Sequence, residues 1–326
     1  MSDLAEAQPA IAARPRRRGL VIPGLLLAAF VAAPFLASSS GAEGYVLSLL
    51  TRVMIYGLAA LSLDLILGYG ALVSFGHAAF LGIGAYSVGI LASHGIEEGL
   101  VQLPVALAAS ALFAFVTGAI SLRTKGVYFI MITLAFGQML LFFVRSLAAY
   151  GGDDGFTLPT RSLIAGQPLL QSEMRLYWAT LVCLVAAYLL CRSIVASRFG
   201  RVFRGTKENP VRMEAVGFHP FPYQLAAYVI SGTIAGLAGC LLANQTEFVS
   251  PAFMTWQRSG ELIIMILLGG LGTLHGAIVG AAAFVLLEEG LSRITELWKM
   301  IFGPMLVLVV LFARGGILGM ARRGRG

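Results

Sequence analysis

The chain has 326 residues, of which 58% are hydrophobic and only 12% are charged, and its mean hydropathy is +0.85. Ordinary soluble domains carry about 25% charged residues, so neither a soluble enzyme nor a disordered chain fits this composition. Three cysteines are too few for a disulfide framework. The net charge of +7 could suggest nucleic acid, but most basic residues fall on one side of a membrane, so no such partner is expected. The composition indicates an integral membrane protein.

Apolar runs long enough to cross a membrane, about 20 residues each, recur along the chain. They lie near residues 20–38, 46–67, 72–92, 101–122, 127–147, 176–195 and 223–245, with a last run near 297–313. Residues 259–290 are also apolar but are cut by glycines at 269, 270, 272 and 276, so they form either one kinked span or two short ones. The predicted fold class is all-α, a polytopic membrane protein of about ten transmembrane helices with glycine-rich broken segments.

The distribution of Lys and Arg distinguishes nine spans from ten, because cytoplasmic loops are enriched in basic residues. With ten spans and a cytoplasmic N-terminus, 16 of the 23 Lys and Arg lie inside, whereas nine spans would put the Arg-rich C-terminal tail outside. We therefore expect basic cytoplasmic tails at 1–18 and 314–326 around a membrane domain at 19–313. The first apolar run also resembles a secretory signal, but its length of about 19 residues exceeds a signal core of about 7–15.

Two glycine clusters, at 68–89 and 269–280, mark places where helices can break inside the membrane. Two interpretations stay open. Glycines spaced by four, as at 232 and 236 or at 272, 276 and 280, allow another helix to pack closely. Alternatively, residues 68–77 and 269–276 unwind, and unwound backbone at membrane depth persists only where protein or water covers it, as along the substrate paths of transporters.

A few polar side chains stand inside the apolar runs. Asp64 lies in the sequence Leu-Ser-Leu-Asp-Leu-Ile-Leu, and a carboxylate facing lipid costs at least about 2.5–3.5 kcal/mol. It should therefore face the bundle, approach the cytoplasmic interface or be neutral. His77 and His275 border the glycine clusters, and no group of residues has metal-ligand spacing. Residues 200–207 imitate a phosphate-binding loop, but its final Lys and Thr are exchanged.

The loop at 196–222 is the most informative polar segment. It is 27 residues long and basic at first. Asn209-Pro210 then predicts the start of a short helix over Val211–Val216, and Gly217 predicts its end. The apolar residues of that helix suit either a groove in a partner protein or the lipid surface.

Three parts of the chain are similar to signatures of one transporter family. The first runs from Gly68-Tyr69 through Ser74-Phe75-Gly76-His77-Ala78-Ala79-Phe80 to Gly82-Ile83-Gly84-Ala85-Tyr86. The second comprises Ser197, Gly200-Arg201, Lys207-Glu208-Asn209, Glu214-Ala215 and Gly217. The last comprises Ser231, Ala235-Gly236-Leu237-Ala238-Gly239 and Gly269-Gly270-Leu271-Gly272-Thr273 with Gly276 and Gly280. In this order, they resemble the branched-chain amino acid ABC-transporter permeases of the LivM type.

The resemblance implies a translocation path flanked by 68–77 and 269–276, with candidate residues Asp64, Ser74, Gly76, His77, Gly270, Gly272 and Thr273. It implies that 197–217 docks in a groove of a cytoplasmic ATPase subunit, through Gly200, Arg201, Lys207, Glu208, Asn209, Glu214, Ala215 and Gly217. The other implied partners are a second related permease, a periplasmic solute-binding protein and membrane lipid. ATP and Mg would bind in the ATPase, so no cofactor, metal or enzymatic activity is expected here.

The expected function is therefore inward transport of branched-chain or other hydrophobic amino acids across the bacterial inner membrane, with both termini cytoplasmic. The sequence has Asp64 and Leu72 where the family usually has Asn and Gln. These departures leave urea, short amides or aromatic acids as alternative cargoes. A secondary transporter driven by an ion gradient is the other alternative, with Asp64 as its relay. A membrane enzyme would need a clustered catalytic set, which the sequence does not show.

Overall fold

The computed structural model describes residues 21–38, 43–293, 300, 302–304 and 316–317. The longer helices are α1 (Val21–Ser38), α2 (Glu43–Gly70), α3 (His77–Ser93), α4 (Gly99–Ser121), α5 (Val127–Ser146), α6 (Glu173–Ala196), α7 (Arg198–Glu208), α8 (Pro210–Ala215), α9 (Pro220–Thr246), α10 (Trp256–Gly269) and α11 (Leu274–Ser292). Short 3-10 helices η2 (Ala148–Tyr150) and η3 (Pro251–Met254) join the others. Strands β1 (Phe156–Thr157) and β2 (Phe248–Val249) pair antiparallel.

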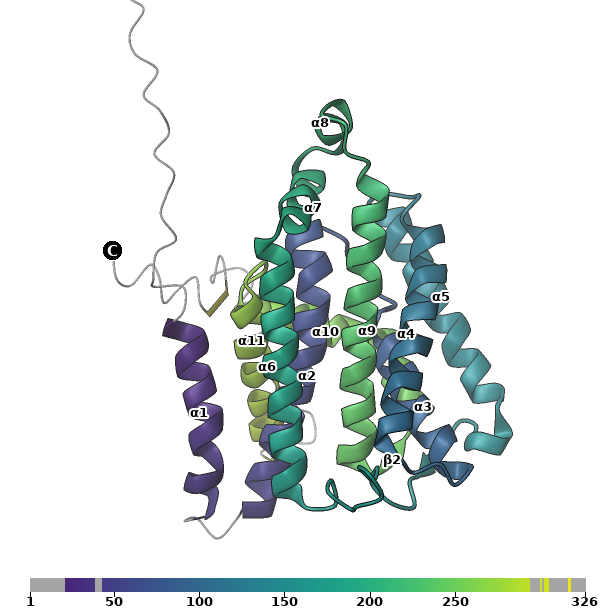
Figure 1. Cartoon of the computed structure of the whole chain (residues 1–326), viewed down its shortest axis with the longest axis vertical. Helices are drawn as coiled ribbons and strands as arrows, with labels where there is room; N and C mark the ends of the chain where they lie inside the picture. Colours follow the sequence, from purple (N-terminus) through teal and green to yellow (C-terminus); the bar gives the residue numbers. More distant parts are fainter. Residues whose placement is uncertain (1–20, 39–42, 294–299, 301, 305–315, 318–326) are drawn as a thin grey trace, which may run out of the picture.

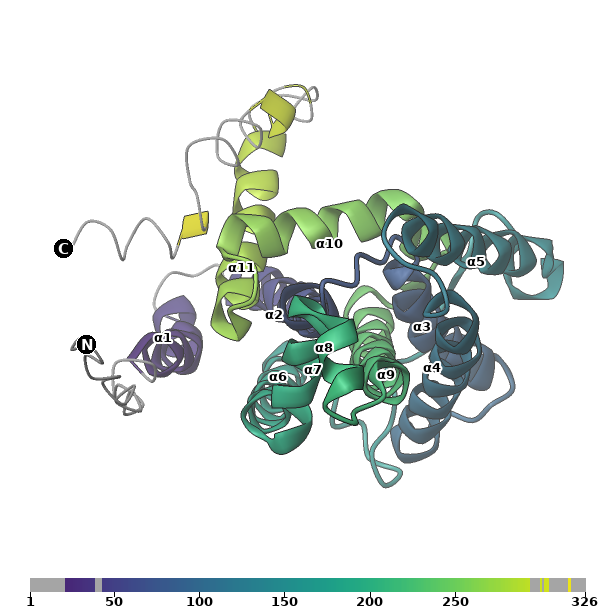
Figure 2. The same ribbon diagram turned by 90° about the horizontal axis from the view of Figure 1, so that it is seen from above.

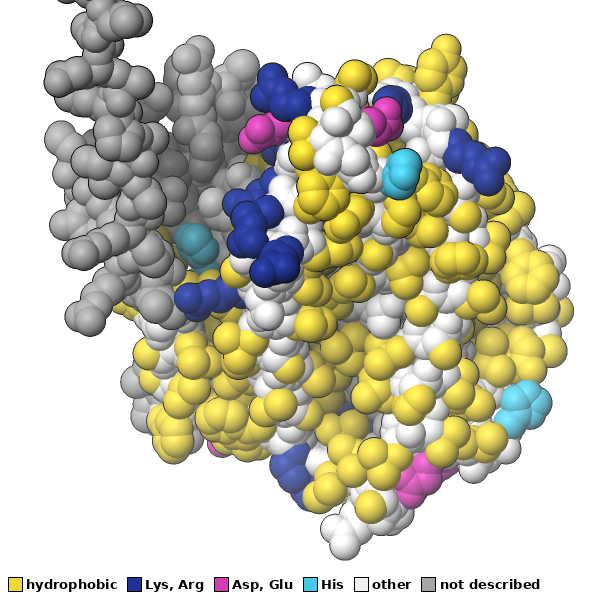
Figure 3. All heavy atoms as spheres, turned by 45° about the horizontal axis from the view of Figure 1, so that its top comes forward, with side chains coloured by type: hydrophobic (Ala, Val, Ile, Leu, Met, Phe, Trp, Pro, Cys, Tyr) yellow, Lys and Arg dark blue, Asp and Glu magenta, His cyan; other side chains and the backbone are white. Residues whose placement is uncertain are grey.

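Helices α2 and α9 form the centre of the bundle (Figure 1), and α8 projects from one end while β2 lies at the other. We call these the α8 end and the β2 end. The apolar windows of α2 and α9 are 72% and 67% buried, against 28% for α4, α5 and α6. Side chains such as Leu112, Phe142 and Val182 on the outer helices are exposed and apolar, as a lipid-facing surface requires. Basic side chains gather near the α8 end, over α6 and α7 (Figure 3).

Six of the described helices, α2, α4, α5, α6, α9 and α11, are long and apolar enough to cross a membrane. This finding supports an all-α polytopic membrane protein, whereas the count of ten is not reached among the described residues. The predicted tails and the last predicted span fall largely outside them. The expected span at 72–92 is shorter than predicted, because residues 71–76 are not helical and α3 has 17 residues.

Helix α10 also differs from the expectation of a short span. It has 14 residues, a length of roughly 21 Å. Seen along the long axis of the molecule, α10 appears side-on while α2, α6 and α9 appear nearly end-on (Figure 2). It therefore lies across the bundle, from the side of α3 and α5 to α11. The chain then turns at 270–273 into α11, so residues 259–290 are two helices at an angle and not one kinked helix.

Small residues allow α9 to approach its neighbours closely. A Cβ on Gly84 of α3 would collide with the carbonyl of Gly236 in α9, and one on Gly239 would collide with the carbonyl of Leu81. A Cβ on Gly236 would collide with Ser110 of α4. Glycines also allow α10 and α11 to approach each other closely. These glycines form the close helix contacts that small residues provide in membrane proteins.

Replacing Gly84 by Ala should lower the melting temperature in detergent, because the added Cβ forces α3 away from α9 at a cost of about 1–3 kcal/mol. Gly260→Ala in α10 is the matched control, since nothing lies within 4 Å of its added Cβ. The control should be neutral or slightly stabilising. Equal melting temperatures for the two variants would show that the α3–α9 contact is not tight.

Candidate functional site

Asp64 lies at a junction of three elements near the α8 end of α2. Its side chain is fully buried, and its Oδ1 accepts a hydrogen bond of 2.8 Å from the backbone N–H of Gly272. Oδ2 has no hydrogen-bond partner in the described part of the chain. A Cβ on Gly68, one turn further along α2, would collide with Asp64 and with Gly272. Asp64 therefore faces the bundle, as predicted, and holds the turn between α10 and α11.

The turn at 270–273 needs its glycines. Gly270 has φ +118° and Gly272 has φ +73°, conformations that residues with a Cβ rarely adopt. Thr273 Oγ1 donates a hydrogen bond of 2.6 Å to the Gly270 carbonyl. The predicted path residues Asp64, Gly270, Gly272 and Thr273 thus come together as one hydrogen-bonded unit.

Helix α7 of the predicted coupling loop contacts the same end of α2. Lys207 Nζ donates a hydrogen bond of 2.8 Å to the Gly68 carbonyl, one helical turn from Asp64. The buried Phe203 ring packs on Gly70, where a Cβ would collide with it. The coupling loop and the glycine turn therefore meet at the last turn of α2. Lys207 was predicted from the sequence but Phe203 was not. The only indication of Phe203 in the sequence is that it is an aromatic residue inside a basic segment.

His77 belongs to a second buried polar set, away from Asp64. Ser62 Oγ donates to the Ala59 carbonyl at 2.7 Å and lies 2.9 Å from His77 Nε2, so His77 is the donor in that pair. Ser231 Oγ of α9 donates to the Ser62 carbonyl, and Ser259 Oγ of α10 accepts from the N–H of residue 78. This set connects α2, α3, α9 and α10. Sequence analysis missed its serines because Ser is common in membrane helices.

The other two predicted path residues lie in or next to the linker between α2 and α3. Ser74 is fully buried. Gly76 lies against α5, where a Cβ would collide with the Thr133 carbonyl. The start of this linker, residues 70–73, lines a cavity of about 480 Å³ near the α8 end, together with Lys125, Lys207 and residues of α8 and α9.

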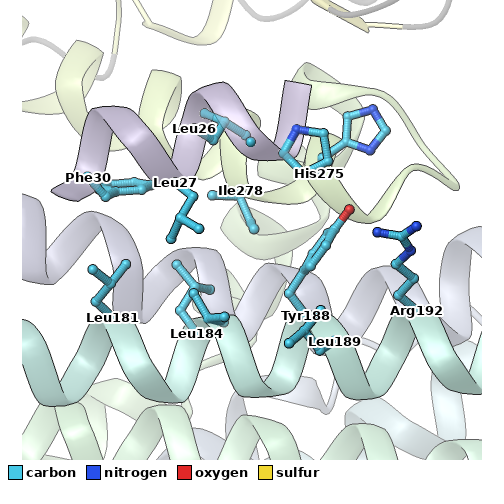
Figure 4. A pocket seen from close by; sticks show the side chains of 13 residues that line it. Leu26, Leu27, Phe30, Leu181, Leu184, Tyr188, Leu189, Arg192, His275 and Ile278 are labelled. Atoms are coloured by element: carbon cyan, nitrogen blue, oxygen red, sulfur yellow. The ribbon is translucent and has the colours of Figure 1, made fainter. Parts of the chain in front are cut away.

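Two further cavities lie elsewhere in the bundle. One, of about 330 Å³, is near the β2 end between α2, α9, α10 and α11. The other, of about 200 Å³, lies between α1 and α6 (Figure 4), where Leu27 and Phe30 face Leu184. Tyr188, Arg192 and His275 stand at one end of it. Because its lining is otherwise apolar, it suits a lipid chain better than a polar solute.

The predicted coupling residues form two helices that leave the bundle. Asn209 Oδ1 accepts a hydrogen bond of 2.9 Å from Arg212 N, so Asn209 caps α8, and Gly217 ends it with φ +93°. The predicted start and end of α8 are therefore confirmed, whereas no helix was predicted for the basic segment that forms α7. A Cβ on Gly200 would collide with the last carbonyls of α6, which explains a glycine at the bend from α6 to α7. The exposed members of the set are Arg201, Lys207, Glu208, Glu214, Ala215 and Gly217.

Apolar spanning helices, non-helical segments within the bundle and cavities near both ends are features of membrane transport proteins. Within the described residues, no group of three or more His, Cys, Asp or Glu is placed to hold a metal ion.

The chain matches the family described as "Branched-chain amino acid transport system / permease component" over residues 45–310, and it belongs to that family. It is 27% identical to the high-affinity branched-chain amino acid transport system permease protein LivM of Salmonella typhimurium, covering 96% of this chain and 78% of that protein. It is 24% identical to a probable LivM of Methanocaldococcus jannaschii, covering 81% and 90%. It is also 27% identical to the autoinducer 2 import system permease protein LsrC of Yersinia pestis, covering 64% and 62%. No solved structure matches the chain.

Replacing Asp64 tests whether its hydrogen bond or its charge matters. Asp64→Asn keeps an oxygen for the Gly272 N–H and should leave the melting temperature and solute uptake near wild type. Asp64→Leu leaves that N–H without an acceptor and should destabilise the protein by about 1–3 kcal/mol. Loss of uptake in Asp64→Asn at normal membrane levels would instead indicate a charge-dependent role, as in an ion relay.

Proposed function

We propose that this chain is the transmembrane permease subunit of an ABC importer that moves branched-chain or other hydrophobic amino acids into the cytoplasm. ATP and Mg would bind in partner ATPase subunits. A periplasmic binding protein would deliver the solute, and a second related permease would complete the membrane part. The names of the relatives support an importer permease, and they include permeases for two different kinds of solute.

One structural observation supports the proposal: the predicted coupling loop contacts the last turn of α2, and the same turn of α2 contacts the glycine turn inside the bundle. Helix α8 projects from the bundle (Figure 1) and presents Val211 and Val216, which are 70% and 67% exposed, at its tip. Met213 packs back on Gly205 of α7. Exposed apolar side chains on a rigid, capped helix suit a groove in a partner protein. Movement of α8 by such a partner would reach α2 through Lys207 and Phe203.

The proposed topology has ten membrane segments, one of which is α10 although it lies across the bundle, with both termini and the α8 end on the cytoplasmic side of the bacterial inner membrane. The basic residues of α6 and α7 at the α8 end support this orientation. The cavities near the two ends would then open alternately as the complex changes state. The engagement of Asp64 by a backbone N–H supports a structural role and disfavours an ion relay. Leu72 lines the cavity at the α8 end, so urea, short amides and aromatic acids stay as alternative cargoes to be tested.

The proposal is tested in proteoliposomes that contain the complete complex, built with ATPase, second permease and binding protein. Uptake of L-leucine should require internal ATP and Mg and should persist when ionophores abolish ion gradients. Uptake that needs a gradient but not ATP would contradict the proposal and favour the secondary transporter. ATP-driven uptake of urea, an amide or an aromatic acid, but not of leucine, would show that the cargo is one of these alternative solutes.

Gly217→Val should reduce solute-stimulated ATP hydrolysis and uptake together, by about tenfold or more, because Gly217 ends the helix that docks. Gly95→Val is the matched control. Both glycines have positive φ, +93° and +78°, and nothing lies within 4 Å of an added Cβ on either. Both variants thus carry similar backbone strain, but Gly95 follows α3 at the β2 end. If Gly217→Val hydrolyses ATP and takes up solute at the same rates as Gly95→Val, the α8 segment connects α7 to α9 without docking in a partner.

A further inference from the structure

The cavity near the β2 end has an unusual combination of charges and apolar surface. It is lined by Tyr45, Ser48, Leu49, Arg52, Tyr56, Leu242, Gln245, Thr246, Phe253, Arg258 and Glu289. Its volume of about 330 Å³ is near the lower end of the range for small-molecule sites, about 300–1,000 Å³. The proposed topology places this end at the periplasmic side of the membrane, where the binding protein would deliver the solute.

Every charged residue of the lining has an opposite charge beside it. Arg52 pairs with Glu288 at 3.2 Å, Arg258 pairs with Glu261 at 2.7 Å, and Glu289 pairs with Arg293 at 3.5 Å. Three cations thus balance three anions, and the cavity is strongly dipolar without a net charge. Such a site favours a ligand that carries both a positive and a negative group, and it offers no net attraction to a simple anion or cation.

The lining also contains an acceptor that is not used. Gln245 Nε2 donates to Ser48 Oγ at 3.1 Å, but the buried Gln245 Oε1 has no hydrogen-bond partner among the described residues. A buried amide oxygen without a donor is costly, and an ammonium group or water would satisfy it. Glu289, whose carboxylate accepts from the Tyr45 hydroxyl at 2.6 Å, lies on the same cavity.

The inner wall of the cavity is apolar. Leu242 and Phe253 also border a small void of about 10 Å³ next to Leu81 and Leu262. Tyr56 lies between this wall and the guanidinium of Arg52, which is 5.9 Å from the ring centre. Polar groups of both signs therefore stand on one side of an aliphatic and aromatic surface.

We infer that this cavity is the outer binding site of the permease for a zwitterionic solute with an apolar side chain. The solute's carboxylate binds Arg258 and Arg52, its ammonium group binds Gln245 Oε1 and Glu289, and its side chain packs on Leu242 and Phe253. This inference rests on the proposed function and narrows it. An α-amino acid with an aliphatic side chain fits the site, whereas urea, amides and aromatic acids lack one or both charges.

The test removes one ion pair from the lining without leaving an unpaired charge. The double variant Arg258→Gln, Glu261→Gln should lower leucine uptake by the reconstituted complex about tenfold or more, because a carboxylate loses a charged donor. The double variant Arg145→Gln, Asp153→Asn is the matched control, since this pair of 3.1 Å also lies near the β2 end but outside the cavity. The control should transport leucine at the wild-type rate. The control should also keep the wild-type melting temperature and basal ATP hydrolysis, and both variants should reach wild-type levels in the membrane.

A second variant probes the unused acceptor independently. Gln245→Leu should raise the leucine concentration for half-maximal uptake several-fold while the binding protein's own affinity stays the same. Excess leucinamide, which lacks the carboxylate, and 4-methylpentanoate, which lacks the ammonium group, should not inhibit wild-type uptake.

Two results would overturn the inference while leaving the proposed function intact. One is leucine uptake at the control rate in both cavity variants. The other is loss of the second permease from the Arg258, Glu261 variant during purification, which would make these charges a subunit interface. If the wild-type complex imports a neutral or singly charged solute but no zwitterionic amino acid, the proposed cargo itself is wrong.

Discussion

The hydrogen bond from the Gly272 N–H to Asp64 is the interaction on which the arrangement of the functional elements depends. In a membrane, a backbone N–H must find an acceptor within the protein, and no backbone carbonyl of the described residues accepts from the Gly272 N–H. Asp64 supplies it from α2. This contact brings the turn against Gly68, where a side chain would not fit, and the Gly68 carbonyl in turn accepts a hydrogen bond from Lys207.

The consequence is a continuous connection from the coupling segment to the interior. Phe203 and Lys207 contact the last turn of α2, the last turn of α2 holds the glycine turn, and the glycine turn sets the angle between α10 and α11. Helix α10 carries Arg258, which lines the cavity near the β2 end, and Ser259, which binds the start of α3. These contacts link α7 to residues that line the cavities near both ends.

Sequence reasoning predicts the parts of this arrangement that follow from local chemistry. Apolar length places the helices, and Asn209, Pro210 and Gly217 define α8, because capping depends on nearest neighbours. The burial of Asp64 also follows from the cost of a carboxylate in lipid. The identity of its hydrogen-bond partner does not follow from the sequence, because any backbone N–H within reach could donate to Asp64. Gly272, the actual donor, is 208 residues away.

Tertiary packing decides the rest. The run at 72–92 is apolar over the length of a full span, yet residues 71–76 are not helical and Gly76 packs against α5. Hydropathy also cannot show that α10 lies across the bundle, since an apolar helix buried at any angle has the same composition. At the cavity near the β2 end, the Arg52–Glu288 ion pair joins α2 to α11 over a long separation that no sequence spacing reveals, whereas Arg258–Glu261 and Glu289–Arg293 are local pairs.

The most direct measurement of this connection is hydrogen–deuterium exchange at the glycine turn after a change in the coupling segment. In Lys207→Met, backbone amides of 270–276 should exchange faster than in the wild type, while those of α4 stay unchanged. Lys125→Met, at another lysine that lines the same cavity, should leave 270–276 as in the wild type. Unchanged exchange at 270–276 in Lys207→Met would contradict the connection between the coupling segment and the interior.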